Sequence, residues 1–136
     1  MATTDFYNEN ATQLIERYDN ADMSSLHKLL LKYTPYKSSV FDIGFGSGRD
    51  LQFLNDNSYD IWGIDPSIKF VQNAKNRFPT KKEQFFEIGV PFDKKEIGLN
   101  KKFDTVITIA MWMHIKHDKY ADVVESILSV AKSTVI

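Results

Sequence analysis

Three glycines recur at every second position in the segment VFDIGFGSGRD, residues 40–50, directly after an apolar stretch. Glycine weakens the interior of a helix or strand, so this density indicates a backbone that turns sharply or is closely approached. The preceding residues, Ser39–Ile43, read as a short buried strand, and the following residues, Arg49–Asn57, read as a helix. The segment therefore predicts a strand, a tight glycine turn and a helix.

The rest of the chain alternates between short apolar runs and amphipathic helical patterns. We predict strands at Tyr59–Ile64, Gln84–Ile88 and Phe103–Ala110, helices at Phe6–Tyr33, Ser67–Phe78 and Asp118–Lys132, and a fifth strand starting at Ser133. Alternating strands and helices favour an α/β fold with a parallel sheet and right-handed crossovers. Ligands of such sheets bind beyond the carboxyl ends of the strands, where the glycine loop is expected.

Composition limits the partners of this chain. A length of 136 residues suits one compact core, and a net charge of −1 argues against a general nucleic-acid or anionic-membrane surface. The absence of cysteine excludes a disulfide framework and a thiolate zinc site, and no His/Asp/Glu spacing is typical of a metal site. The amino terminus has no secretory pattern, and the longest apolar run, Val106–Met113, is too short to cross a bilayer. We expect a soluble, cytoplasmic protein.

An acidic residue, Asp65, closes the second expected strand, about 20 residues after Gly44. Glycines let a ligand approach the backbone, and a carboxylate in this place accepts hydrogen bonds from ribose hydroxyls. Two simpler interpretations remain: a glycine turn without a ligand, and Asp65-Pro66-Ser67 as a plain turn that starts a helix. The combination of the loop, its flanking elements and the acid favours a site for an adenosine-containing cofactor.

Two residues bear on which cofactor is bound. The dinucleotide pattern requires a third glycine three residues after the second, and that position holds Arg49. Asp42, at the end of the first strand, would repel a pyrophosphate but suits a cationic ammonium or sulfonium group. The sequence therefore disfavours a nicotinamide dinucleotide.

The segment VFDIGFGSGRD resembles the cofactor loop of class I S-adenosylmethionine-dependent methyltransferases, and IWGIDPSIKFVQNAK resembles their second strand and following helix. KKFDTVITIAMWMHI is similar to their fourth-strand segment, and FYNENATQLIERY to the amino-terminal cap helix of small-molecule members. The resemblance covers essentially the whole chain. It implies one domain over residues 1–136, with a helical cap at 1–35 and a Rossmann-like, doubly wound core at 36–136 of strand order 3-2-1-4.

The resemblance also implies that the family's sheet continues beyond this sequence, through a further helix and an antiparallel hairpin. The sequence ends at Val135-Ile136, where the fifth strand is expected to have barely begun. We therefore expect the carboxyl-terminal strands to be missing and the apolar fourth strand to have an unpaired edge. Because such edges pair with other chains, a homo-oligomer or a weakly stable protein is predicted.

The resemblance implies a role for each residue of the expected cofactor loop. Gly44, Gly46 and Gly48 would line the methionine and ribose portions of S-adenosylmethionine. Asp42 would face the amino group of the cofactor, and Asp65 would accept from both ribose hydroxyls. The product would be S-adenosylhomocysteine.

The adenine end is assigned by the same resemblance. Pro66 or Ile68 would pack on one face of the adenine, and Ile88 and Gly89 would flank the other. Ala110, ending the fourth strand, would offer its carbonyl to the methionine end. Many family members have an aspartate after the third strand that accepts from the adenine amine, and this sequence has no clear equivalent, since Glu87 is expected to point away.

The acceptor side is less defined by the sequence. His114 is the candidate general base, although a lone histidine in an apolar stretch is often structural. Two interpretations remain open for the aromatic residues. Tyr7 and Tyr18 either close the pocket or pack in the core, and Trp112 either forms a wall of the acceptor site or packs in the core. The implied acceptor is a small molecule. The alternative is a non-catalytic module that binds the cofactor or a partner.

The remaining candidates are Arg49 and the histidines His27 and His117. Arg49 forms an ion pair with Asp50 or reaches the cofactor carboxylate, and both arrangements are compatible with the sequence. His27 and His117 are expected at the surface.

Overall fold

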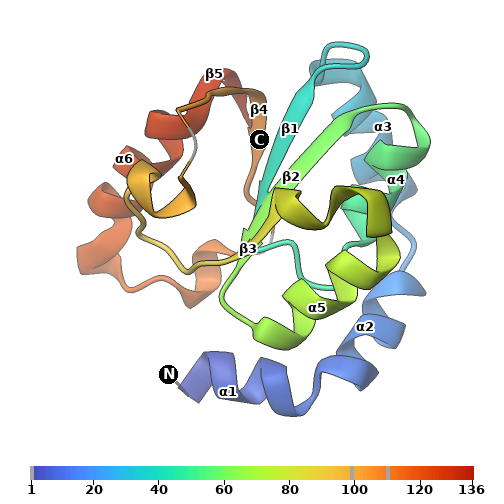
Figure 1. The fold of residues 1–136 in the computed structure, drawn as a ribbon, viewed down its shortest axis with the longest axis vertical. Helices are drawn as coiled ribbons and strands as arrows, with labels where there is room; N and C mark the ends of the chain where they lie inside the picture. Colours follow the sequence, from blue (N-terminus) through green and yellow to red (C-terminus); the bar gives the residue numbers. More distant parts are fainter. Residues whose placement is uncertain (1, 99, 110) are drawn as a thin grey trace.

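A parallel five-stranded sheet forms the centre of the molecule, in the order β3-β2-β1-β4-β5 (Figure 1). The computed structural model describes residues 2–98, 100–109 and 111–136. The strands are β1 Ser39–Ile43, β2 Asp60–Asp65, β3 Phe85–Glu87, β4 Phe103–Ile107 and β5 Ala131–Val135. The predicted α/β class, parallel pairing and strand order are confirmed, and the strand order reverses between β1 and β4.

Helices cover both faces of this sheet, with α6 on one side and α4 and α5 on the other (Figure 1). The α-helices are α1 Ala2–Glu9, α2 Ala11–Asp19, α3 Ser24–Tyr33, α4 Arg49–Asp56, α5 Ile68–Arg77 and α6 Tyr120–Val130. Short 3-10 helices are η1 Pro79–Gln84, η2 Lys94–Ile97, η3 Trp112–His114 and η4 His117–Lys119. Within the described ranges, none of these helices has the length and apolarity needed to cross a membrane.

Each face of the sheet has its own apolar core, because successive strand side chains point to opposite faces. Val40 of β1 packs with Leu51 and Leu54 of α4, whereas its neighbour Phe41 packs on the other face with Ile127 of α6. Strands buried on both faces are typical of parallel sheets covered by helices, and they account for the nearly continuous apolarity of the strand segments.

The amino-terminal region is helical, as predicted for Phe6–Tyr33. It consists of α1, α2 and α3, which join at Asn10 and at residues 20–23. Two strands are shorter than predicted, since β3 is limited to Phe85–Glu87 and β4 ends at Ile107. Ala110, predicted to end β4, lies outside the described residues.

The end of the chain requires the largest correction. The predicted helix Asp118–Lys132 ends at Val130, and Ala131 starts β5 without an intervening loop. β5 pairs with β4, so the predicted unpaired edge of β4 is wrong. Among the described strands, β3 and β5 form the open edges of the sheet.

Candidate functional site

A cavity of about 330 Å³ lies where the carboxyl ends of β1 and β2 meet the segment that follows β4. Its lining combines the glycine loop, the ends of the strands and the cap helices. The lining residues include Thr4, Tyr7, Tyr18, Asp42, Gly44, Gly46, Arg49, Asp50, Asp65, Pro66, Ile88, Gly89, Met111, Met113 and His114. The cavity therefore occupies the place in the sheet where ligands of open α/β folds bind.

The glycine loop turns through the left-handed region that only glycine adopts without strain. Gly44 and Gly46 have φ of 74° and 56° and line the cavity. Gly48, at φ 82°, is the N-cap of α4, and a Cβ there would face Arg77 and Phe78. The structure thus does not place Gly48 among the cavity-lining residues, and its glycine serves the start of the helix.

Asp65, the last residue of β2, is only 5% exposed and binds two backbone amides. Its Oδ1 accepts from the Ser67 N–H at 2.9 Å, and its Oδ2 accepts from the Gly46 N–H at 3.0 Å. Burial raises the pKa of Asp65 to about 6, against the lowering effect of these two hydrogen bonds. Each oxygen still has acceptor capacity toward a ligand, since a carboxylate oxygen accepts more than one hydrogen bond.

Asp42 is a buried carboxyl group facing the cavity, with only 3% of its surface exposed. No hydrogen bond or ion pair joins its carboxyl oxygens to another of the described residues. Burial raises its pKa well above the usual range, the nearby Asp50 and Asp65 raise it further, and only Arg49 opposes them. A buried polar group without a partner is costly, so this carboxyl group is suited to a cationic or donor ligand in the cavity.

Sequence reasoning missed the contribution of Phe45 and Gly63 to the loop. Phe45 is buried in the core between the two cavity glycines, and its ring packs edge-on against Phe85. A Cβ on Gly63 of β2 would lie 2.7 Å from Cδ2 of Phe45. The signal that could have found this contact is a glycine inside a strand, which often marks a close approach.

The residues assigned to the adenine end are partly brought together. Pro66, Ile88 and Gly89 line the cavity, whereas Ile68 does not. Glu87 is exposed and does not line the cavity, in agreement with its predicted direction.

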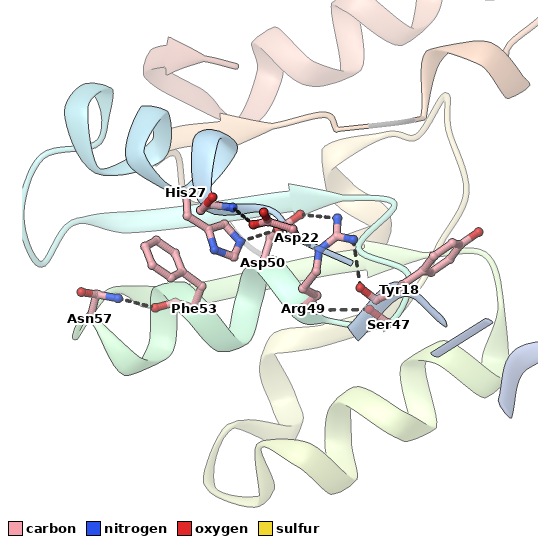
Figure 2. Close-up of polar contacts among 9 residues, drawn as sticks. Tyr18, Asp22, His27, Ser47, Arg49, Asp50, Phe53 and Asn57 are labelled. Atoms are coloured by element: carbon pink, nitrogen blue, oxygen red, sulfur yellow. Dashed lines mark hydrogen bonds and ion pairs between the residues drawn. The ribbon is translucent and has the colours of Figure 1, made fainter. Parts of the chain in front are cut away.

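A polar network ties the start of α4 to the cap helices (Figure 2). Asp50 accepts from His27 of α3 at 2.9 Å and is contacted by the Arg49 Nε at 3.3 Å. Arg49 also donates from Nη1 to the Tyr18 carbonyl at 3.1 Å. The ion pair expected between Arg49 and Asp50 is present, but His27, predicted at the surface, is half-buried and stacks on Phe53.

The first cap helix, α1, contributes Thr4 and Tyr7 to the lining of the cavity. Its Tyr7 hydroxyl is 2.8 Å from Nε2 of His114 in η3, and its Asn8 accepts from the Ser67 hydroxyl at 2.5 Å. The structure therefore brings Tyr7 and His114 together at the cavity. Nothing in the sequence indicated this contact. Trp112 does not line the cavity; its Nε1 donates to the Thr108 hydroxyl, and its ring packs against the α6 core.

Comparison with known proteins agrees with this geometry. A family model described as a methyltransferase domain matches residues 15–135. The chain belongs to this methyltransferase family. The predicted family resemblance is thereby confirmed. No curated protein sequence matches the chain.

Several solved methyltransferases share the fold. A TehB-like SAM-dependent methyltransferase from Corynebacterium glutamicum superposes with a TM-score of 0.72 at 19% identity, covering 96% of this chain and 67% of that one. Magnesium protoporphyrin IX methyltransferase from Synechocystis, solved with bound SAM, superposes with a TM-score of 0.68 at 17% identity. The match covers 96% of this chain and 71% of that one. The structure of DesVI from Streptomyces venezuelae shares the fold with a TM-score of 0.66 at 20% identity, and the match covers 84% of this chain but only 47% of DesVI.

Proposed function

We propose that this methyltransferase binds S-adenosylmethionine in the cavity and transfers its methyl group to a small-molecule acceptor. The observation that carries the proposal is the unpartnered, buried Asp42 carboxyl group, which faces a cavity beside Gly44 and Gly46. A cationic, nucleoside-bearing ligand supplies what these residues lack: a positive charge for Asp42 and hydroxyl donors for Asp65. The family match and the SAM named with the solved neighbours support the same ligand.

The charges of the cavity fit this ligand better than a pyrophosphate. Three carboxyl groups line it, those of Asp42, Asp50 and Asp65, against one guanidinium, that of Arg49. Arg49 already binds Asp50 and the Tyr18 carbonyl, so it is not free to neutralise phosphates. A pyrophosphate would raise the pKa values of Asp42 and Asp65 further, whereas a cationic ligand favours their ionised forms.

The positions of the acidic residues orient the proposed ligand. Asp65 ends β2, so the ribose belongs on the β2 side, with the adenine between Pro66 and Ile88. Asp42 lies on the central strand β1, in register with Gly63 of β2 and Ile107 of β4, so the methionine end would lie beside the loop that follows β1. When bound, the sulfonium supplies an electrophilic methyl group, so the chain itself chiefly orients the reactants and excludes water.

A small-molecule acceptor is supported by the cover over the cavity. Thr4 and Tyr7 of α1 and Tyr18 of α2 line it, so the cap helices narrow the approach to the ligand. A macromolecular acceptor would need this cover displaced.

The second candidate function is a non-catalytic module that retains cofactor binding. It requires only the cavity with Asp42, Asp65 and the glycine loop, and no acceptor site. The two functions are distinguished by product formation, because both bind S-adenosylmethionine but only the enzyme forms S-adenosylhomocysteine.

Isothermal titration calorimetry tests the proposal directly. We expect S-adenosylmethionine and S-adenosylhomocysteine to bind, NAD not to bind, and Asp42→Asn to weaken S-adenosylmethionine by roughly tenfold or more, since a charge-assisted hydrogen bond contributes about 1.5–3 kcal/mol. Exposed Asp56→Asn is the matched control and should bind as the parent does. Binding of NAD in place of both sulfur nucleosides would overturn the proposal.

A further inference from the structure

On the proposed ligand orientation, the hydrogen bond between Tyr7 and His114 lies toward the sulfur of S-adenosylmethionine. A Cβ on Gly44 would lie 3.4 Å from Cβ of Met111, so the segment entering η3 packs directly beside the glycine loop. His114 ends η3 and lines the cavity, whereas the ribose-side Asp65 lies on β2. On the proposed ligand orientation, the methyl group therefore faces the Tyr7–His114 pair.

We propose that Tyr7 and His114 form a proton relay for the acceptor, and that the acceptor is an uncharged, apolar molecule bearing a hydroxyl group. This inference rests on the proposed function. Tyr7 is the catalytic residue that contacts the acceptor hydroxyl, and His114 is the positioning residue that takes up the proton through Tyr7. The 2.8 Å distance between the Tyr7 hydroxyl and Nε2 is short enough for this transfer.

The surroundings of the pair agree with these roles. Burial raises the pKa of Tyr7, and the nearby Tyr18 raises it further. The phenol of Tyr7 is therefore protonated at neutral pH and can donate to Nε2. Tyr7 is half-buried and its ring packs against Phe70, whereas His114 is exposed. A proton received at Nε2 can therefore leave from Nδ1 to solvent.

The proposed step is balanced in atoms and electrons. The acceptor oxygen forms a bond to the methyl carbon while the carbon–sulfur bond breaks, with its electron pair passing to sulfur. The acceptor proton passes to the Tyr7 oxygen as the Tyr7 proton passes to Nε2 of His114. The products are a methyl ether and S-adenosylhomocysteine, and the imidazolium loses its proton to water.

The charge and polarity of the cavity define the acceptor class. The buried Met111 and the 73% exposed Met113 both line the cavity near the pair, so they can contact an apolar body. The carboxyl groups of the cavity repel an anionic acceptor, and the only guanidinium in the lining is bound to Asp50. A phenol is thus a suitable probe, and benzoate is its anionic counterpart of similar shape.

The first test measures acceptor binding rather than turnover. Phenol and benzoate are titrated against the protein saturated with S-adenosylhomocysteine, with ligand-observed NMR as the readout. We expect phenol to bind, benzoate not to bind, and Tyr7→Phe to weaken phenol about threefold to tenfold, the contribution of one hydrogen bond. Tyr36→Phe, at a 75% exposed tyrosine, is the control and should match the parent.

The outcomes separate the two proposals. Calorimetry that shows no binding of S-adenosylhomocysteine refutes the proposed function. If S-adenosylhomocysteine binds but phenol does not, or binds no better than benzoate, or is unaffected by Tyr7→Phe, the relay is refuted while cofactor binding stands.

A second test addresses His114 through formation of S-adenosylhomocysteine from S-adenosylmethionine and phenol. We expect His114→Ala to lower kcat by about 100-fold with little change in the KM for phenol, because general base catalysis contributes about 10²–10⁴-fold. Added imidazole should restore part of the rate, which a purely structural role would not allow. His117→Ala, at an exposed histidine outside the cavity, is the control. A raised KM with unchanged kcat, or no product from the parent, overturns the relay.

Discussion

The Gly46 amide donates a hydrogen bond to Oδ2 of Asp65 at 3.0 Å, so the acid that ends β2 holds the glycine loop that follows β1. The other carboxyl oxygen, Oδ1, accepts from the Ser67 amide at the start of α5. Asp65 therefore joins the loop after β1 to the end of β2 and the start of α5. The same residue has a structural role and a proposed binding role, and experiments must separate them.

Replacement of Asp65 separates these roles. Asp65→Ala removes the acceptor of two backbone amides, and we expect the free energy of unfolding to fall by about 1–3 kcal/mol, the cost of leaving buried donors unsatisfied. Asp65→Asn keeps an acceptor oxygen and should lose less. Urea denaturation measures both, with exposed Asp56→Ala as a control expected within about 0.5 kcal/mol of the parent. Equal stability of the parent and Asp65→Ala would contradict the structural role.

Stability should depend on pH through the same residue. Burial raises the pKa of Asp65 to about 6 in the folded protein, against about 3.9 in an unfolded chain. Between these values the unfolded chain releases a proton that the folded protein keeps, so the free energy of unfolding falls as pH rises. The fall amounts to about 3 kcal/mol, since one pKa unit corresponds to about 1.36 kcal/mol.

The comparison with Asp65→Asn reports this effect together with the influence of Asp65 on the pKa of Asp42, which acts in the same direction. The pKa values of Asp22 and Asp104 are lowered by their hydrogen bonds with Ser24 and Ser39, and their contributions act in the opposite direction. Because both proteins contain these residues, their contributions cancel in the difference. Denaturation at pH 4, 5, 6 and 7 should show the parent losing stability relative to Asp65→Asn as pH rises. A difference that is constant with pH would contradict the raised pKa.

Local patterns carried most of the fold prediction. Each glycine, apolar strand and helix start near the loop acts within a few residues, so the sequence of Ser39–Ile43, its turn and α4 was sufficient to place them. The end of α6 had no such signal. Ala131 continues the apolar helical stripe, and no glycine or proline marks the change to β5, so only pairing with β4 decides the boundary.

Contacts between distant parts of the chain could not be predicted. Tyr7 and His114 are separated by 107 positions, and their hydrogen bond depends on where α1 crosses the sheet. α6 illustrates the same limit, because Val124 and Leu128 are next to the buried Val123 and Ile127 in the sequence yet are 43% and 59% exposed. Periodicity identifies an apolar face but does not show which part of it a neighbouring element covers.

The glycine inside β2 should be intolerant of any side chain. In Gly63→Ala the new Cβ would lie 2.7 Å from Cδ2 of Phe45 and 3.0 Å from the Asp42 carbonyl oxygen, so the core must shift. We expect a loss of about 1–3 kcal/mol in the free energy of unfolding, as for other overpacked cores. Gly89→Ala is the contrast, since its Cβ would lie 3.7 Å from Pro66, an ordinary contact. Equal stability of the two variants would contradict the tight packing of Phe45 on β2.

The bond between His27 and Asp50 should stabilise the attachment of α3 to α4, because it joins a half-buried imidazole to a buried carboxyl group at 2.9 Å. A double-mutant cycle of His27→Ala and Asp50→Asn isolates this contact, since the stacking of His27 on Phe53 is lost equally in both arms. We expect a coupling energy of about 1 kcal/mol from urea denaturation. The exposed pair Lys132 and Asp104, whose charged atoms are 3.8 Å apart, is the control and should couple by less than about 0.5 kcal/mol. Coupling no larger than in this control would show that α3 is held by apolar packing alone.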